Sequence, residues 1–338
     1  MGFANANCTK EKMNTPLKIL VIGAAGMLGR KLIEHLASEG ELAGQVIANL
    51  SRHDVVLCPP PPKSGFTIET QIGDLSEAGE AQKLVAVRPD IIFHLAAIVS
   101  GEAEADFEKG YRINLDGTRN LLEAIRLVGD SYCPCLIFTS SIAVFGSPFP
   151  AAIQDDFLSA PLTSYGTQKA ICELLISDYS RRGFMDGMAL RMPTVCVRPG
   201  LPNKAASGFF SNIIREPLAG KEAILPVEED VRHWHASPRA AISFLLKAAA
   251  MGGSPLGSRR ALTLPGLSCT VGEQLAALQR VGGEKALKLV RRVPDENIRR
   301  IVSGWPRNFA ALRAKELGFS AENSFDDIIK VHLEDERI

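Results

Sequence analysis

Short apolar runs alternate with longer helical patterns between Leu17 and Pro199, and this alternation limits the possible fold more than any other feature. It is typical of βαβ units, in which a helix connects two parallel strands of one sheet. We expect strands at 17–22, 49–57, 66–70, 91–95, 135–139 and 188–197. We expect helices at 27–38, 76–87, 107–127 and 164–181. The sequence therefore predicts an α/β fold built on a parallel sheet.

The alternation breaks down after Pro199, where proline and glycine recur at short intervals. Helical patterns return at 238–250 and 271–281. We expect residues 17–199 to form the domain that carries the sheet, and residues 200–338 to form mainly a smaller lobe that closes over the end of that sheet. Residues 1–16 lack the apolar core of a signal peptide, so we expect a flexible polar leader.

The charges balance, because 38 basic residues face 38 acidic ones without a basic stripe or an acidic tail. Electrostatics therefore gives no reason to expect nucleic acid or an anionic membrane as partner, and a small molecule is the better expectation. No segment has the ~18 apolar residues that cross a bilayer. The cysteines lack metal-ligand spacing, and His233-Trp234-His235 alternates too tightly for one helical face. We expect a cytoplasmic protein without a metal site.

Gly23, Gly26 and Gly29 follow the first expected strand and open the first helix. In such a loop, the first glycine permits a tight turn, the second lets backbone N–H groups approach a pyrophosphate, and the third lets helix pack on strand. The helix N-terminus adds a partial positive charge. The loop therefore predicts a dinucleotide cofactor, held by these glycines together with Met27 and Leu28.

A carboxylate at the end of the second strand normally binds the adenosine ribose and indicates NAD. Asp54 ends the strand that we expect there, although Asn49 fits the usual spacing from Gly23 better. Arg52 would instead suit the 2′-phosphate of NADP. We favour NAD with Asp54.

Two later strand ends are expected beside the cofactor. Asp74, followed by Leu75, either binds the adenine amino group or caps a helix that begins at Ser76. The fourth strand ends in mostly small residues that let the backbone pass close to the cofactor, namely Leu95, Ala96 and Ala97.

Tyr165 and Lys169 lie four residues apart on an expected helix, so their side chains point the same way. A tyrosine that acts as a base near pH 7 needs its pKa lowered by ~3 units, and a nearby ammonium supplies part of this. We expect Tyr165 to take a proton from a substrate hydroxyl, while Lys169 lowers the pKa of Tyr165 and holds the nicotinamide ribose. Ser141, at a strand end, would hydrogen-bond the reacting oxygen. Asn114 would anchor Lys169 directly or through a water, or is simply a polar residue inside a helix.

These motifs, in their order along the chain, resemble the extended short-chain dehydrogenase/reductase family over about residues 17–330. The resemblance implies a Rossmann-type doubly wound parallel sheet with a smaller mixed C-terminal substrate lobe, and NAD as cofactor. It implies that Pro193 and Val195 lie against the nicotinamide carboxamide. It also implies a possible homodimer through the helices at 107–127 and 164–181.

Four longer stretches resemble the D-erythronate dehydrogenase group of that family, namely 99–107, 164–187, 198–220 and 264–273. The resemblance implies that NAD oxidises the C2 hydroxyl of a small sugar acid to the 2-oxo acid. The lobe over the site would supply cations or amides for the carboxylate. The expected substrate contacts are Ser100, Ser141, Tyr165, Asn203 and Arg232.

Two alternatives remain open. A nucleotide-sugar epimerase or dehydratase of the same fold would need a deeper lobe with two anion-binding groups, and Phe145 stands where many extended members carry tyrosine. A non-catalytic protein that senses the dinucleotide would not need Tyr165, which such modules often lose. The second strand, at 50–54, is also more polar than the family pattern.

Overall fold

The computed structural model describes residues 15–129, 131–200 and 206–337. Over these residues, seven parallel strands form the main sheet in the order β4, β3, β1, β5, β6, β7, β11, and a short β2 pairs antiparallel with β3. The bounds are β1 (Leu17–Ile22), β2 (Glu41–Leu42), β3 (Gln45–Asp54), β4 (Thr67–Ile72), β5 (Ile91–His94), β6 (Cys135–Ser141), β7 (Asp186–Met192) and β11 (Ala261–Thr263). The expected α/β class with a doubly wound parallel sheet is confirmed.

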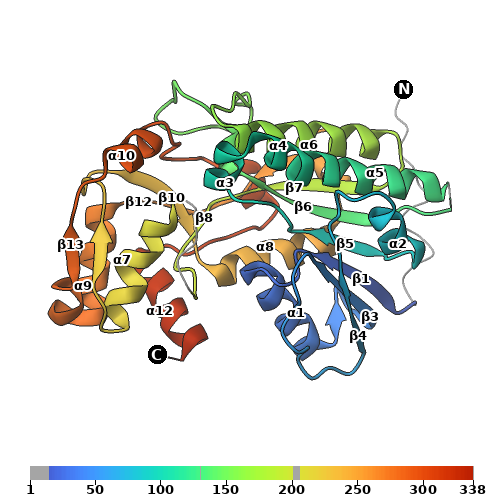
Figure 1. The fold of residues 1–338 in the computed structure, drawn as a ribbon, viewed down its shortest axis with the longest axis horizontal. Coiled ribbons are helices and arrows are strands. Elements are labelled where there is room, and N and C mark those ends of the chain that lie inside the picture. The colour runs from blue at the N-terminus through green and yellow to red at the C-terminus, as the bar shows by residue number, and fades with distance from the viewer. Residues whose placement is uncertain (1–14, 130, 201–205, 338) are drawn as a thin grey trace.

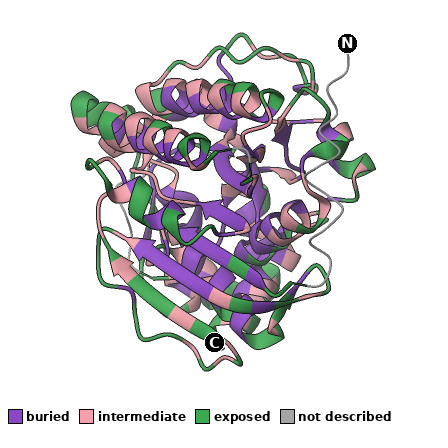
Figure 2. Cartoon of the chain, turned by 90° about the vertical axis from the view of Figure 1, so that its right-hand side faces the viewer, coloured by how far each residue is buried: buried purple, intermediate pink, exposed green. Residues whose placement is uncertain are grey.

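Helices cover both faces of the sheet (Figure 1). One face carries α2 (Glu80–Ala86), α5 (Gly117–Val128) and α6 (Ser164–Arg181), and the other carries α1 (Met27–Glu39) and α8 (Pro238–Met251). Neighbouring residues of β1 therefore enter different apolar cores, since Leu20 packs on one side and Val21 on the other. Burial on both faces explains why the strands read as continuous apolar runs, and Figure 2 shows the central strands buried.

A smaller lobe stands beside the carboxyl ends of the strands (Figure 1). It has its own apolar core, and two small sheets of order β12-β10-β8 and β13-β9. The elements of this part of the fold are β8 (Thr194–Val195), α7 (Gly208–Leu218), β9 (Ala223–Leu225), β10 (Arg232–Ala236), β12 (Leu267–Thr270), α9 (Val271–Leu287), β13 (Val290–Arg292), α10 (Glu296–Ser303) and α12 (Phe325–Glu336). Two short helices, α3 (Ser100–Ala105) and α4 (Phe107–Gly110), precede α5, and α11 (Leu312–Glu316) contacts β11.

The second strand differs from our expectation, because β3 begins at Gln45 and ends at Asp54 rather than spanning 49–57. Its polar residues are tolerated in the sheet because they have partners: Arg52 donates to Thr70 and to the carbonyl of Pro59, and His53 contacts Glu80. Pairing of buried polar groups in this way removes most of their desolvation penalty.

Three other boundaries also differ. The expected helix at 76–87 begins only at Glu80, and the one at 107–127 is interrupted by a π-helix at Tyr111–Asp116. The range 200–338 is not a single spatial unit, because α8 packs against α1 and β11 pairs with β7 of the main sheet. The chain thus forms part of the lobe first and then contributes α8 and β11 to the large domain.

The strand order reverses between β1 and β5. From β1 the chain moves outward to β3 and β4, and later strands extend the sheet on the other side. The loops that follow β1 and β5 therefore diverge and leave a crevice at the carboxyl edge, which is where open α/β sheets bind ligands. Among the described residues, no helix is long and apolar enough to cross a membrane.

Candidate active site

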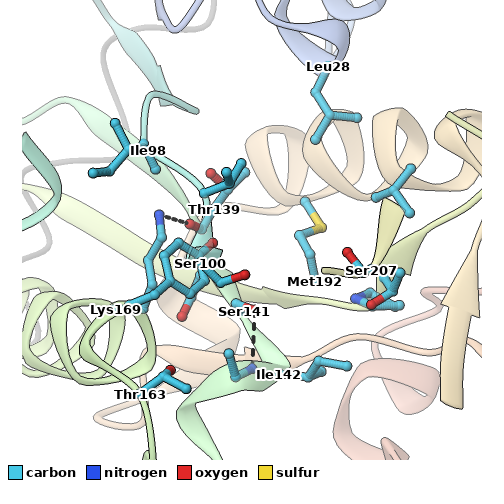
Figure 3. A pocket seen from close by; sticks show the side chains of 18 of the residues that line it. Leu28, Ile98, Ser100, Thr139, Ser141, Ile142, Thr163, Lys169, Met192 and Ser207 are labelled. Carbon is cyan, nitrogen blue, oxygen red and sulfur yellow. Dashed lines mark hydrogen bonds between the residues drawn. The ribbon is translucent and has the colours of Figure 1, made fainter. Parts of the chain in front are cut away.

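A cavity of about 380 Å³ lies at this carboxyl edge. Its walls come from the glycine loop after β1, the ends of β5 and β6, the start of α6 and the smaller lobe. Figure 3 shows Ser100, Thr139, Ser141 and Lys169 gathered on one side of it, facing Leu28 and Met192. The described residues contain no cluster of three or more side chains that could hold a metal ion.

The glycine loop is packed so closely that larger residues would not fit. Gly23 has φ +88°, and a Cβ there would lie 2.6 Å from the backbone nitrogen of Ala96. A Cβ on Gly29 would lie 2.3 Å from the carbonyl oxygen of Gly23. The helix that follows has Gly26 at its N-cap and no side chain satisfying its first N–H groups. This arrangement suits a pyrophosphate, and Met27 and Leu28 line the cavity beside it.

Asp54 lies next to the glycine loop, because its carboxylate accepts a hydrogen bond from the backbone N–H of Ala25 at 2.9 Å. It is therefore near the end of β3 where a ribose would need an acceptor. Asn49 lies farther back in the strand, where its side chain contacts Ser51. Arg52 is directed toward Thr70 and Pro59 instead of the loop. The arrangement favours Asp54 over the two alternatives.

Asp74 is engaged within the protein and does not line the cavity. Its carboxylate accepts hydrogen bonds from the backbone and hydroxyl of Ser76 and from Arg112. Although burial raises the pKa of Asp74, these bonds and the charge of Arg112 hold it below its usual value. The expected helix cap at Asp74 is wrong, because α2 begins later with Gly79 at its N-cap. The side chain of Leu75 is buried in the apolar core.

The end of β5 does approach the loop. Leu95 continues the pairing with β1, since its N–H donates to the carbonyl of Ile22. Leu95 and Ala97 line the cavity, and the backbone of Ala96 contacts Gly23. Pro193 and Val195 line it as well, just beyond β7.

Tyr165, Ser141 and Lys169 all line the cavity. Thr163 caps α6 by accepting from the N–H of Gly166, which places Tyr165 in the first helical turn. Ser141, the last residue of β6, accepts from the N–H of Ala143 at 3.1 Å, and its hydroxyl lowers the pKa of the Tyr165 phenol. Lys169 donates to the carbonyl of Thr139 at 2.7 Å (Figure 3).

The electrostatics of this group differs in part from the expectation. Burial raises the pKa of Tyr165 to about 12, and the Ser141 hydrogen bond and the charge of Arg198 oppose this rise. Burial also lowers the pKa of Lys169 to about 8, against the charges of Cys172 and Glu173. The Lys169 ammonium lies 5.7 Å from the centre of the Tyr165 ring. The cation that lowers the pKa of the phenol in this structure is thus Arg198.

Asn114 makes no direct hydrogen bond to Lys169 among the described residues, and an anchor through a water stays a prediction. Its amide donates to the side chain of Gln168 at 2.7 Å and exchanges hydrogen bonds with the backbone of Ile98. It lies in the π-helix, and π-helical turns often occur near functional sites. Asn114 therefore holds a cavity-lining segment against α6.

Only some of the residues expected to contact the substrate line the cavity. Ser100 lines the cavity from the start of α3. Asn203 lies outside the described residues. Arg232 does not line the cavity, because its guanidinium donates to the carbonyl of Ser268 and pairs with Glu273. The alternation of β10 directs Arg232 to one face and His233 to the other.

Several residues that line the cavity from the lobe side were not expected from the sequence, among them Arg198, His233 and Trp305, and Ser207 of the lobe lines it as well. His233 was judged on helical geometry, whereas a two-residue period places it and His235 on the same face of a strand. Burial lowers the pKa of His233 to about 4, so its imidazole is neutral. Its Nδ1 must donate to the carbonyl of Pro306, and its Nε2 accepts from the Thr194 hydroxyl at 2.7 Å.

The chain was then compared with known proteins. The model of the NAD dependent epimerase/dehydratase family matches residues 19–237. A D-erythronate dehydrogenase of Cupriavidus necator is 45% identical over 94% of this chain and 98% of its own length. One of Haemophilus influenzae is 40% identical over 94% and 99%. These findings confirm the resemblance seen in the sequence.

Solved structures agree on the fold. A crystal structure from Agrobacterium tumefaciens, described as a nucleoside-diphosphate-sugar epimerase, is 58% identical, covers 97% of both chains and has a TM-score of 0.93. An L-threonine dehydrogenase of Cupriavidus necator has a TM-score of 0.80 at 22% identity, over 94% of this chain and 99% of its own. The similarity to the second structure supports the Rossmann-type fold and nothing further.

We expect Gly29→Ala to weaken NAD binding at least tenfold. The added Cβ would collide with the carbonyl of Gly23 and push the start of α1 away from the glycine loop. Isothermal titration of NAD into the purified variant measures this. Gly65→Ala is the matched control, since nothing lies within 4 Å of a Cβ there. An unchanged NAD affinity in Gly29→Ala would contradict the role given to the loop.

Proposed function

This chain belongs to the NAD-dependent epimerase/dehydratase family, and we propose that it oxidises the C2 hydroxyl of a small sugar acid, D-erythronate or a close analogue, to the 2-oxo acid. The proposal rests mainly on one observation: Tyr165, with its hydroxyl bonded to Ser141, lines a small cavity that has cationic but no acidic side chains among its described lining residues. The two D-erythronate dehydrogenases, at 45% and 40% identity, support the choice of acid.

The residues present fit NAD. We propose that Gly23, Gly26 and the start of α1 hold the pyrophosphate, that Asp54 binds the adenosine ribose, and that Lys169 binds the nicotinamide ribose. Leu95, Ala97, Pro193 and Val195 would supply the walls of the nicotinamide pocket. When bound, NAD supplies the ring that accepts the hydride.

Tyr165 would accept the proton of the C2 hydroxyl, and Ser141 would donate a hydrogen bond that stabilises the phenolate. The pKa of about 12 that burial gives Tyr165 is too high for a base near pH 7. Each unit of pKa corresponds to ~1.4 kcal/mol, so bringing it to 8 needs ~5 kcal/mol from positive charge close to the phenol. The value of about 12 already includes the charge of Arg198, so the remaining positive charge is expected from the nicotinamide end of the site.

A nucleotide-sugar epimerase is the second candidate, favoured by the description of the 58% identical structure. One observation weighs against it, because Phe145 is buried and carries no hydroxyl at the site. A purely dinucleotide-sensing role would not require Tyr165 and Lys169 in the same cavity.

Incubation of the purified protein with NAD and D-erythronate is expected to generate reduced cofactor, followed by its absorbance. UDP-glucose under the same conditions is expected to give none. Turnover of UDP- or dTDP-sugars without any oxidation of D-erythronate would contradict the proposal.

Tyr165→Phe is expected to lower kcat by a factor of roughly 10² to 10⁴, because the proton acceptor is lost while the ring still fills its place. Titration of NAD should show unchanged affinity. Tyr111→Phe, in the π-helix and outside the cavity, is the matched control and should retain wild-type kcat. The proton-transfer role fails if Tyr165→Phe turns over at the wild-type rate.

A homodimer and a cytoplasmic location are further proposals. Large apolar side chains are exposed along the helices expected at the interface: Phe107 on α4, Leu127 on α5 and Leu174 on α6, with exposed fractions of 59%, 63% and 72%. Exposed apolar side chains on these helices support an interface there.

Light scattering should therefore give twice the 36.5 kDa mass of one chain, and Leu174→Glu should shift the mass toward a single chain. Leu57→Glu, equally exposed but in a loop after β3, should not. A wild-type mass of one chain would rule out the dimer.

A further inference from the structure

We propose that Arg198 binds the carboxylate of the substrate and so selects acids whose reacting hydroxyl is on the adjacent carbon. The inference rests on the proposed function in that it takes the substrate to be a hydroxy acid. It assigns the acid-binding group to the segment after β8, and not to Arg232, the arginine that the sequence had indicated.

The guanidinium of Arg198 is held in a fixed position. Its Nε donates to the carbonyl of Val195 at 2.9 Å, and its Nη2 donates to the hydroxyl of Ser207 at 3.0 Å. The backbone is fixed too, because its N–H donates to Ser211 and its carbonyl accepts from Arg215. A side chain that is already ordered loses little entropy when it binds a ligand.

Arg198 also lacks a carboxylate partner among the described residues. Two other arginines with little exposure, Arg191 and Arg215, pair with Glu173 at 2.7 Å and Glu216 at 2.6 Å. Burial lowers the pKa of Arg198, and the groups that oppose this shift, Cys196 and Tyr165, are not carboxylates. Buried charges are normally paired, so a guanidinium of this kind is suited to an anion supplied by a ligand.

The charge of the residues that line the cavity is also consistent with an anionic ligand. Its described lining residues include no aspartate or glutamate and two cationic side chains, Lys169 and Arg198. Lys169 is already engaged with the carbonyl of Thr139. Arg198 lines the lobe side of the cavity together with Ser207 and Trp305, and it has donor capacity left for a carboxylate.

Arg198 and Tyr165 face the same cavity, as the carboxylate and the reacting hydroxyl of one substrate require. The charge of Arg198 also lowers the pKa of the Tyr165 phenol. In a 2-hydroxy acid, the carboxylate and the hydroxyl are on neighbouring carbons. A cation and a base that line one cavity therefore suit a hydroxy acid of this kind.

The test compares an acid with its neutral analogue. Wild type and Arg198→Met are assayed with NAD and either D-erythronate or D-erythronamide. We expect Arg198→Met to raise KM for D-erythronate at least ~30-fold, the effect of losing a charge-assisted pair, with little change for the amide. Arg198→Lys keeps the charge but loses the planar fork, so it should recover only part of the loss.

A control variant, a second test variant and a binding measurement accompany this comparison. Arg280→Met removes an exposed arginine that pairs with Asp326 far from the cavity, and it should leave both KM values unchanged. Ser207→Ala keeps Arg198 but removes one of its positioning bonds, so it should raise KM for the acid several-fold even if Arg198→Met folds poorly. Titration of D-erythronate into protein saturated with NADH measures binding without turnover.

The outcomes separate this inference from the proposed function. Oxidation of D-erythronate with the same KM in wild type, Arg198→Met and Ser207→Ala would overturn the role of Arg198 and leave the function intact. If wild type does not oxidise D-erythronate, the proposed function fails, and titration of glycolate, D-lactate and D-glycerate then tests Arg198 alone. If wild type binds any of these acids and Arg198→Met does not, the inference is supported. If no acid binds, or if Arg198→Met loses only the binding of UDP-glucose, the inference is overturned.

Discussion

The contact between Gly23 and the backbone of Ala96 is the constraint on which the rest of the site depends. A Cβ on Gly23 would lie 2.6 Å from the Ala96 nitrogen, so the loop after β1 and the end of β5 can approach each other only because the first residue is glycine. These two strand ends border the point where strand order reverses. Their close approach sets the floor of the cavity and leaves the N-terminus of α1 free to face an anion.

Around that floor, the protein buries polar groups that would be costly without a ligand or an internal partner. Lys169 is buried, with its ammonium over Phe138 and bonded to one carbonyl. Tyr165 is bonded to Ser141, and Arg198 is bonded to Ser207 and to a carbonyl. No acidic side chain among the described lining residues neutralises the two cations. An anionic substrate offsets this charge when it binds, which connects the electrostatics of the cavity to the acid that we propose.

Much of this architecture could be predicted from local patterns in the sequence. The glycine spacing, the apolar strands and the Tyr165 to Lys169 pair each depend on residues close together in the chain. They can therefore be interpreted from the sequence alone. The contacts of Asp74 with Arg112 and of Asn114 with Gln168 could not be predicted, because these partners are 38 and 54 residues away in the chain. Arg198 and His233 were missed because the lobe has short irregular segments, and nothing local shows which face of β10 meets the cavity.

The most direct measurement is a crystal structure of the protein with NADH and D-erythronate bound together as a non-reacting complex. The account predicts the C2 hydroxyl within hydrogen-bonding distance of both Tyr165 and Ser141, with the carboxylate on the guanidinium of Arg198. A hydroxyl directed away from Tyr165, or an acid bound outside the cavity, would contradict it.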